Sequence, residues 1–553
     1  MPTDIRAAGD AAASADQPYA YPLLIKQLLH TPLAHAPGQE IVYRDVCRHT
    51  YRDLGARIGR LGSALSRLGV GFGDTVAVAD WDSHRYLESY FAIPMLGAVL
   101  MTVNVRLSPE QIAWTIEHAA DDVILVHEDF LPLLDAIRPR LAHVRRFVLL
   151  CDHAGGEALG GLPFAGEYEA LLAAATGDFA FPEVAEDARA TTFYTTGTTG
   201  LPKGVFFSHR QLVLHTLGVR STLSGTGQGH IGADDVYMPI TPMFHVHAWG
   251  MPLVALSMGL KQVYPGRYEP AKLLRLIVRE GVSFSHCVPA ILQMLLNCPD
   301  GREMDLDGWK VLIGGSALPE SLAIAALERG IDVFGGYGMS ETCPILCVAQ
   351  LTPEVLRRPF AEQVRIRCKA GRAAPLVQLR IVDDEMNDVA HDGIAQGEVI
   401  ARAPWLTEGY LHNPEAGAAL WRGGWLHTGD IGTIDDDGYL KITDRLKDVI
   451  KTGGEWVSTL MLEDLILRLH EVAECAVVGI PDPRWDERPL ALVVLRGGAS
   501  LDPAMIRAHL AGFVAEGLIP KYALPERIEQ VEAIPKTSVG KLDKKAIRAQ
   551  YAG

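Results

Sequence analysis

A short stretch rich in threonine and glycine, residues 194–204 (YTTGTTGLPKG), is the feature that most constrains what this chain can fold into. It combines four threonines, three glycines and one lysine, Lys203. Glycines let backbone N–H groups approach an anion closely, while hydroxyls and a lysine add donors and positive charge. The stretch therefore predicts a loop that holds a triphosphate. It is not a Walker loop, in which lysine directly follows glycine, because a Leu-Pro pair separates Gly200 from Lys203.

The length and charge of the chain exclude several classes of protein. With 553 residues the chain is too long for one compact core, so we expect two or more domains. The 51 basic and 67 acidic residues give a net charge of -16, which disfavours nucleic acid as a partner and provides no polybasic membrane anchor. Anionic substrates must therefore meet positive charge at the site itself.

The cysteines and the amino terminus predict a cytoplasmic protein. The eight cysteines form no CxxC pair, and no second pair or nearby histidine completes a zinc set with Cys343 and Cys347, so reduced thiols are expected. Residues 1–20 are rich in alanine and aspartate and predict a disordered tail without a secretory signal. The uncharged stretch at 89–105 is short for a membrane span and predicts a buried helix that runs into a strand, so no integral membrane segment is expected.

Helical and strand patterns alternate through the first part of the chain. Leucine and isoleucine repeat at helical spacing between residues 54 and 68, and Thr50 with Asp53 supplies a capping box at the start of that helix. Short buried strands are predicted at 75–79, 123–126 and 147–150. This alternation predicts an α/β domain with largely parallel sheets. Residues 152–190, rich in glycine, alanine and glutamate, are expected to form a surface connection.

A second, smaller unit begins near Asp444. Apolar runs at 475–479 and 490–495 predict strands, and residues 503–513 predict a helix. This is an α+β unit of about one hundred residues, a typical domain size. The expected organisation is a disordered tail at 1–20, a large multi-subdomain N-terminal domain at 21–444 and a small C-terminal domain at 445–553.

Five further motifs accompany the threonine-rich loop. They are GGSA at 314–317, GYGMSET at 336–342, WLHTGD at 425–430, DRLKD at 444–448 and a Gly-Lys pair at 540–541. Singly, each has an ordinary explanation, because glycine turns are common and most charge runs are solvated. Together and in this order they resemble the adenylate-forming (AMP-binding) superfamily of acyl- and aryl-CoA synthetases, luciferases and peptide-synthetase adenylation domains. The resemblance runs from about residue 54 to residue 545 and is strongest to the bacterial medium- and long-chain fatty acyl-CoA synthetases.

The resemblance implies a reaction in two steps. A carboxylate attacks the α-phosphorus of ATP to give acyl-AMP and pyrophosphate, and the thiol of coenzyme A then displaces AMP. Cations and N–H donors are expected to dominate such a site, because two anions must be brought together. The implied small-molecule partners are ATP, coenzyme A and a carboxylic acid, with Mg²⁺ as the metal.

The resemblance assigns the phosphates, the adenine and the metal to these motifs. The phosphate contacts would come from Thr195, Thr196, Gly197, Thr198, Thr199 and Lys203. Tyr337 would lie against the adenine, and Thr342 would bond the α-phosphate. Glu341, with help from Thr196, would bind Mg²⁺, for which a carboxylate and phosphate oxygens are suitable ligands. The remaining residues around the nucleotide would be Gly315, Ser316, Gly336, Gly338 and Met339.

The last motifs imply a ribose site and a moving lid. Asp430 would accept the ribose hydroxyls, a role that needs an acceptor without a proton, and Arg445 is the expected second ribose contact. Lys447 falls at the hinge position about which the lid domain swings between the half-reactions.

The C-terminal lysines have different expected roles. Lys541 resembles the lid lysine that reaches the carboxylate and the α-phosphate during adenylation, where a mobile point charge is suitable. Lys544 and Lys545 are expected to be part of a solvated basic tail. The coenzyme A side would include Lys451, Gly453 and Gly454.

The acid-binding side is the least determined by the sequence. Residues 242–250 (PMFHVHAWG) match an aromatic pocket element of the family, with His245 as a catalytic candidate and Val246 and Trp249 beside it. On a strand His245 and His247 would share a face, and a metal pair is conceivable, although no third ligand supports it. His247 also departs from the closest fatty-acyl pattern, in which asparagine is expected.

Trp456, after Gly-Gly-Glu, favours a fatty acid, because in similar fatty acyl-CoA synthetases it closes the acyl tunnel until ATP binds; a lid-core tryptophan is the alternative. The prediction is an ATP- and Mg²⁺-dependent acyl-CoA ligase for medium- to long-chain fatty acids, by analogy a homodimer. The alternatives keep the mechanism on a short thioether-bearing or branched acid such as methylmercaptopropionate, or on an aryl acid. Other classes are an adenylation enzyme that loads a carrier protein, although no carrier motif follows Lys541, and a non-catalytic relative.

Overall fold

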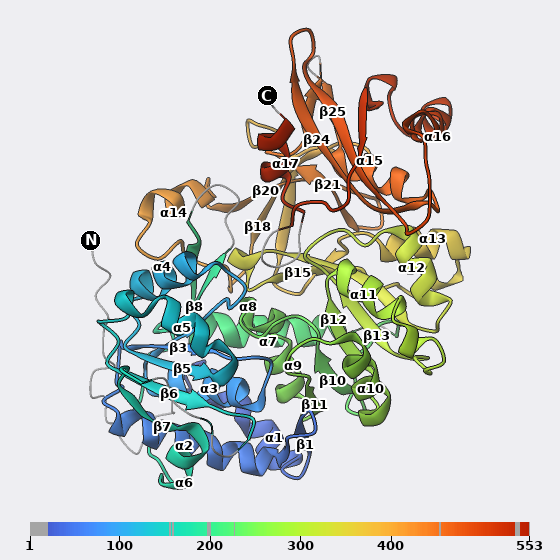
Figure 1. Cartoon of the computed structure of the whole chain (residues 1–553). Coiled ribbons are helices and arrows are strands. Elements are labelled where there is room, and N and C mark those ends of the chain that lie inside the picture. The colour runs from blue at the N-terminus through green and yellow to red at the C-terminus, as the bar shows by residue number, and fades with distance from the viewer. Residues whose placement is uncertain are drawn as a thin grey trace.

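The computed structural model describes residues 20–153, 156, 160–195, 201–225, 227–452, 455–536 and 542–551. Figure 1 shows a large N-terminal body and a smaller C-terminal unit above it, coloured orange to red. This architecture is mixed α/β, with largely parallel sheets in the large part, and it confirms the predicted fold class.

The first sheet has seven strands and carries the threonine-rich loop. In spatial order the strands are β7 (Phe164–Glu167), β6 (Arg146–Leu150), β5 (Val123–His127), β3 (Thr75–Ala79), β4 (Val99–Thr102), β8 (Arg189–Thr195) and β9 (Lys203–Ser208). Neighbouring strands are parallel except β8 and β9, which form an antiparallel hairpin with Thr195 opposite Lys203. Thr195 and Lys203, the described residues on either side of the predicted phosphate loop, therefore face each other at the end of this hairpin.

The second sheet has nine strands and a parallel centre. In spatial order they are β16 (Arg372–Ala373), β15 (Ile345–Val348), β14 (Asp332–Gly338), β13 (Lys310–Ile313), β12 (Phe284–Cys287), β10 (Val236–Pro239), β11 (Lys261–Tyr264), β1 (Glu40–Tyr43) and β2 (Cys47–Thr50). Antiparallel pairing is confined to the β14–β15, β15–β16 and β1–β2 pairs. The GGSA and GYGMSET motifs lie at the ends of the neighbouring parallel strands β13 and β14.

Helices cover and separate these two sheets. They are α1 (His30–His35), α2 (Tyr51–Arg67), α3 (His84–Met95), α4 (Pro109–Ala119), α5 (Leu131–Ala136), α6 (Tyr168–Ala173), α7 (His209–Leu223), α8 (Val246–Trp249), α9 (Met251–Ser257), α10 (Pro270–Glu280), α11 (Pro289–Leu296), α12 (Glu320–Leu327), α13 (Phe360–Arg367) and α14 (Pro414–Leu420). The predicted capping box is present at the start of α2, where Thr50 and Asp53 bond each other's backbone N–H groups. The predicted buried helix and strand at 89–105 are α3 and β4.

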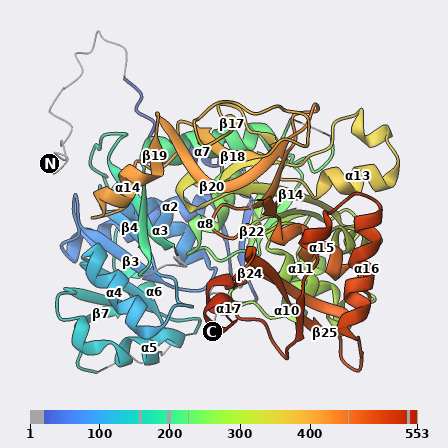
Figure 2. The same ribbon diagram turned by 90° about the horizontal axis from the view of Figure 1, so that it is seen from above.

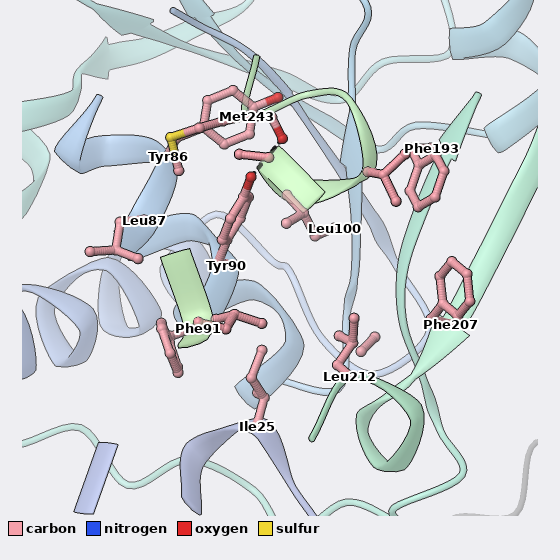
Figure 3. Packing of buried hydrophobic residues seen from close by; sticks show 14 of the residues in the cluster. Ile25, Tyr86, Leu87, Tyr90, Phe91, Leu100, Phe193, Phe207, Leu212 and Met243 are labelled. Atoms are coloured by element: carbon pink, nitrogen blue, oxygen red, sulfur yellow. Dashed lines mark hydrogen bonds between the residues drawn. The ribbon is translucent and has the colours of Figure 1, made fainter. Parts of the chain in front are cut away.

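Helix α3 lies at the centre of the large core. Its residues from His84 to Pro94 are all buried. Tyr86, Tyr90 and Phe91 belong to one apolar cluster with Phe193 of β8 and Leu212 of α7, so the helix is enclosed by side chains from several elements (Figure 3). The buried faces of α3 include the charged Arg85 and Glu88 as well as apolar residues, so the helix needs polar partners inside the domain.

The predicted surface connection at 152–190 is wrong in part. The segment contains the edge strand β7 and helix α6, and Tyr168 at the start of α6 is fully buried, with its hydroxyl donating to Glu88 at 2.6 Å. The hydrogen bond from Tyr168 and the packing of Leu172 in the large apolar cluster hold this segment in place.

A third sheet and the C-terminal unit complete the chain. The third sheet contains β17 (Gln378–Val382), β18 (Gly397–Arg402), β19 (Trp421–Arg422), β20 (Trp425–Ile434) and β21 (Leu440–Arg445), all paired antiparallel. The C-terminal unit, here called the lid, has β22 (Ile450–Thr452), β23 (Glu455–Val457), β24 (Val472–Asp482), β25 (Asp486–Leu495), β26 (Arg527–Gln530), α15 (Thr459–Leu467), α16 (Pro503–Ala515) and α17 (Lys544–Tyr551). The strands and helix predicted here are confirmed as β24, β25 and α16.

Among the described residues, no helix is long and apolar enough to cross a membrane. All eight cysteines lie in the described part of the chain, and all are free thiols, as predicted.

Lys544 is buried, although the sequence predicted a solvated lysine. Its Nζ lies 2.8 Å from Glu463 Oε1 and donates to Thr459 Oγ1 at 2.5 Å. Thr459 in turn donates from its backbone N–H to Asp444 at 2.5 Å, so four side chains from β21, α15 and α17 form one polar cluster. The neighbouring Lys545 is exposed, as predicted.

We expect Lys544→Ala to destabilise the lid by about 3 kcal/mol, because it leaves the buried Glu463 carboxylate without its cation. Lys545→Ala is the matched control and is expected to change stability by less than about 0.5 kcal/mol. Hydrogen exchange of the amides in β24 and α15 measures this difference within the lid. Equal exchange rates in the two variants would contradict the burial of this ion pair.

Candidate active site

A cavity of about 1440 Å³ lies between the large domain and the lid. Figure 2 shows the lid helices α15 and α17 above the part of the large domain that carries α11 and β14. The cavity walls come from the end of the β8–β9 hairpin, the ends of β13 and β14, the strands β20 and β21, and the lid residues that follow them. Described residues from the motifs at 194–204, 314–317, 336–342, 425–430 and 444–448 are thus brought to one cavity by three sheets, while the Gly-Lys pair at 540–541 lies outside the described residues.

Lys203 and Glu341 meet at the same tyrosine. Lys203 Nζ lies 4.6 Å from the centre of the Tyr410 ring, and the Tyr410 hydroxyl donates to Glu341 Oε1 at 2.6 Å. Burial and Glu341 raise the Tyr410 pKa, which keeps the phenol protonated as the donor. Tyr410 was not found by the sequence analysis, because its position is set by a bridge to Val205 in the β8–β9 hairpin and not by a local pattern.

The turn after β14 requires glycine by close approach of the backbone. A Cβ at Gly338 would lie 1.7 Å from the carbonyl oxygen of Pro344, so no other residue fits without rearrangement. Gly336, Tyr337, Gly338, Met339 and Glu341 all line the cavity. Thr342 is fully buried, and its hydroxyl accepts from the Met339 backbone N–H at 2.9 Å and contacts the Pro344 carbonyl. In this structure the Thr342 hydroxyl is therefore engaged with the backbone of its own turn.

Asp430 is a buried carboxylate with two partners of complementary character. Only 5% of Asp430 is exposed. Its Oδ2 accepts from the Tyr337 hydroxyl at 2.7 Å, and its Oδ1 lies 3.2 Å from Arg445 Nε. Asp430 and Arg445 are direct partners in the β20–β21 register, so the strands themselves set this pair. Burial and the Asp430 charge raise the Tyr337 pKa, so the phenol donates to the carboxylate.

The apolar side of the cavity is an unusual backbone turn. His245, Val246 and Trp249 line the cavity, as predicted for a pocket wall. The residues from Val246 to Trp249 all have positive φ angles, between 48° and 59°, and form a short left-handed turn that ends at Gly250. This segment therefore contains no strand that would place His245 and His247 on one face. The metal pair considered for these two histidines depended on such a strand and is wrong. His247 is buried, with its Nε2 2.7 Å from Thr191 Oγ1.

Three buried side chains hold the residues just before this turn. Asp82 accepts from the Met243 backbone N–H at 2.8 Å, Tyr90 donates to the Met243 carbonyl at 2.6 Å, and Thr102 donates to the Phe244 carbonyl at 2.8 Å (Figure 3 shows Tyr90 and Met243). Burial raises the Asp82 pKa to about 7, against hydrogen bonds from Tyr268 and Met243. The sequence analysis missed these residues, because only the tertiary fold brings them to this wall.

The end of β13 closes the wall beside Trp249. Gly314, Gly315 and Ser316 line the cavity. A Cβ at Gly314 would lie 2.9 Å from the Trp249 ring, so the glycine allows the indole to pack directly on the backbone. The predicted turn at the strand end is thus in contact with the predicted acyl pocket element.

The lid contributes the remaining surface. Lys447, Asp448 and the residues Lys536 and Leu542, which flank the predicted Lys541 in sequence, all line the cavity. Lys451 is exposed in β22 and pairs through its backbone with Trp456 in β23. The predicted site residues Thr196, Gly197, Thr198, Thr199, Gly453, Gly454 and Lys541 lie outside the described residues, as does the side chain of Trp456.

The donor set at Glu341 fits a hard divalent cation. The carboxylate of Glu341 is at the cavity surface, is 7% exposed, and has Tyr410 as a neutral donor on one oxygen. Oxygen donors of this kind, together with phosphate oxygens and water, are what Mg²⁺ prefers. The residues present therefore fit the metal that the sequence implied.

Comparison with known proteins identifies the family. Residues 29–411 match the AMP-binding enzyme family and residues 461–541 match its C-terminal domain. The chain is 43% identical over 524 residues to a long-chain-fatty-acid–CoA ligase of Thermus thermophilus, covering 93% of each chain. It is 37% identical over 537 residues to a 3-methylmercaptopropionyl-CoA ligase of Ruegeria lacuscaerulensis, covering 96% of this chain and 97% of the relative. The crystal structure of an anthranilate CoA ligase with anthranoyl-AMP superposes with a TM-score of 0.84 at 26% identity, covering 97% and 98% of the two chains. The chain therefore belongs to the AMP-binding enzyme family.

Proposed function

We propose that this protein is an ATP-dependent acyl-CoA ligase that converts a medium- to long-chain fatty acid to acyl-CoA through acyl-AMP. The observation that carries the proposal is one cavity in which Lys203, Glu341 and Asp430 lie on one side and the apolar Val246 and Trp249 on another. Its volume of about 1440 Å³ exceeds the usual range for a single small ligand, which suits a nucleotide together with an acyl chain. The similarity to the Thermus thermophilus ligase supports a long-chain acid.

In the first step the carboxylate oxygen of the acid attacks the α-phosphorus, and the bond from that phosphorus to the pyrophosphate oxygen breaks. No proton transfer is needed, so the work of the protein is to position two anions and to neutralise charge. We assign Lys203 and residues 195–199 to the β- and γ-phosphates, Lys541 to the carboxylate and α-phosphate, and Thr342 to the α-phosphate after a change in its hydroxyl contacts. Gly315, Ser316 and the 336–339 turn would surround the adenine and the α-phosphate.

The Tyr337–Asp430–Arg445 group is suited to the nucleoside. A carboxylate that already has one phenol and one guanidinium donor is held in a fixed position, with lone pairs remaining for ribose hydroxyls. Tyr337 would then present its ring to the adenine while its hydroxyl stays on Asp430. Glu341 and Thr196 would hold Mg²⁺, which when bound neutralises phosphate charge and orients the oxygens of the leaving group.

The acyl chain would lie against Val246 and Trp249, with Trp456 as the gate and His245 at the point where the acid and the nucleotide meet. In the second step the lid would turn about Lys447 and bring Lys451 and residues 453–454 to the coenzyme A side. The thiolate of coenzyme A attacks the acyl carbonyl carbon, the bond from that carbon to the AMP oxygen breaks, and AMP leaves. A homodimer in the cytoplasm stays a prediction.

A second candidate keeps the mechanism and changes the acid. The similarity to a 3-methylmercaptopropionyl-CoA ligase favours a short thioether-bearing acid. A panel of acids from propionate to palmitate, with methylmercaptopropionate and benzoate, tests both when AMP and acyl-CoA are measured together. We expect the highest kcat/KM for acids of medium to long chain. A maximum at methylmercaptopropionate would select the second candidate, and AMP formation without acyl-CoA would contradict a CoA ligase.

We expect Glu341→Gln to lower kcat by about 10²–10³-fold, because it removes a charge that holds the metal while an amide oxygen can still accept from Tyr410. Partial recovery is expected at raised Mg²⁺ concentration, with the melting temperature unchanged. Glu408→Gln is the matched control, because Glu408 is exposed and lies two residues before Tyr410, the partner of Glu341. Pyrophosphate release against Mg²⁺ concentration measures the effect. Parent-like turnover of the Glu341 variant at ordinary Mg²⁺ would reject the metal assignment.

The two half-reactions are expected to separate in lid variants. Lys541→Ala should lose acyl-AMP formation by a factor that corresponds to about 3–4 kcal/mol, yet convert supplied acyl-AMP and coenzyme A at near the parent rate. Lys447→Pro should have the opposite effect, because proline fixes φ at the hinge. Arg507→Ala, at an exposed cation of the lid outside the cavity lining, serves as the control for both. Equal loss of both half-reactions in the Lys541 variant would reject the proposed lid rotation.

A further inference from the structure

Cys47, His49 and His84 form a cluster of metal-ligating side chains, and none of the three lines the cavity described above. One ligand atom from each, a thiol sulfur and two imidazole nitrogens, lies within 4.8 Å of the other two. Cys47 and His49 are two residues apart on β2, so they share one face of the strand, and His84 begins helix α3. None of the residues assigned to ATP, acid or coenzyme A belongs to this cluster.

The distances are close to those of a coordinated ion. Cys47 Sγ lies 3.6 Å from His84 Nδ1 and 3.9 Å from His84 Nε2. With Zn–S near 2.3 Å and Zn–N near 2.0–2.1 Å, a tetrahedral site separates sulfur and nitrogen by about 3.6 Å. The His49 and His84 rings have their centres 5.1 Å apart. A small movement of His49, whose strand lies at the edge of its sheet, therefore completes a three-ligand set.

A carboxylate outside the cluster orients His84. Glu169 Oε1 lies 3.5 Å from His84 Nε2, so it can accept the N–H of that nitrogen and leave Nδ1, the nitrogen nearer to the thiol, with its lone pair. Glu169 is itself fixed by two hydrogen bonds from Arg57, at 2.6 and 2.8 Å. A carboxylate that holds the second nitrogen of a ligating histidine is a regular feature of zinc sites.

The surrounding charge is also suitable. Arg57 binds both Glu169 and the buried Glu88, so this group of three carries one net negative charge. A Cys47 thiolate adds a second negative charge, which balances a divalent cation. His84 is buried, while Cys47 and His49 are only partly buried and leave a path for the ion to enter.

We propose that Cys47, His49 and His84 bind one Zn²⁺ ion, with Glu169 as the positioning residue for His84, and that this ion cross-links β2 to α3. A thiolate with two imidazoles favours Zn²⁺ over Mg²⁺ or Ca²⁺, which prefer oxygen ligands. The fourth coordination position is left to water. The role is structural, because the ion is bound outside the cavity.

Metal binding to the full-length, reduced and chelator-treated protein tests the proposal. Co²⁺ titration is expected to produce a thiolate-to-cobalt charge-transfer band that saturates at one ion per chain. Zn²⁺ is expected to displace the Co²⁺, which removes the band, and to raise the melting temperature of the protein. The thiolate band separates this site from carboxylate sites such as Glu341, which give no sulfur signal. Competition with a chromophoric chelator measures the Zn²⁺ affinity.

Cys47→Ser is expected to abolish the band. His49→Gln is expected to weaken Zn²⁺ binding strongly, and because His49 is only partly buried, this variant tests a ligand without replacing the buried His84. Glu169→Gln is expected to lower the affinity by about 10–100-fold with the band retained, which a merely structural role would not produce. Cys298→Ser, at a partly buried cysteine elsewhere, is the matched control and should bind as the parent does. Absence of the band in the parent, or an equal band in Cys47→Ser, would overturn the proposal.

Discussion

The need to pair a buried carboxylate organises the site around Asp430. An isolated ionised carboxylate at 5% exposure would be strongly unfavourable, so its neighbours are constrained. The β20–β21 register supplies Arg445, and the end of β14 supplies the Tyr337 hydroxyl. These two partners come from different sheets, so Asp430 fixes the position of the third sheet against the nine-stranded sheet. The same contact places the last residue of β21 at the cavity and therefore determines where the lid begins.

In the apolar cavity wall at Val246–Trp249, contacts from neighbouring residues offset the strain of the backbone. Four consecutive non-glycine residues from Val246 to Trp249 have a left-handed backbone, which costs roughly 1–2 kcal/mol per residue for L-amino acids. The wall persists because its neighbours hold it from several sides: Asp82 and Tyr90 bond Met243, and His247 is buried against Thr191. Strained backbone of this kind is found where the surrounding structure over-determines it. The shape of this wall of the cavity is therefore set by side chains that do not line it.

The sequence was sufficient where local signals decide the structure. The capping box at Thr50 predicted the start of α2. The resemblance implied that the motifs at 314–317 and 336–342 surround one nucleotide, and residues of both line one cavity. The sequence was insufficient where residues far apart in the chain determine the local structure. Lys544 follows a basic tail pattern, but Glu463 makes it a buried ion pair. The alternating apolar pattern around His247 resembles a strand, but the packing of the segment imposes a left-handed turn. Strand β7 forms from a segment without apolar alternation because it pairs with β6.

The polar cluster at the start of the lid connects the two parts of the chain. Arg445 is held in register by β20, so Asp444 beside it belongs to the large domain, whereas Thr459 and Lys544 belong to the lid. The bonds from Asp444 to Thr459 therefore cross the proposed hinge at Lys447. Burial raises the Asp444 pKa although Lys544 and the backbone donors oppose it, so this carboxylate is stabilised mainly by partners that lie beyond the hinge. A rotation about Lys447 can proceed by two routes. In the first, Asp444 separates from Thr459 and Lys544. In the second, the polar cluster moves as a unit and the β20–β21 ladder opens at its end. Leaving Asp444 or Glu463 unpaired in the interior costs several kcal/mol. Moving the cluster as a unit opens the ladder at the Asp430–Arg445 pair, so a rotation about Lys447 separates a buried pair by either route.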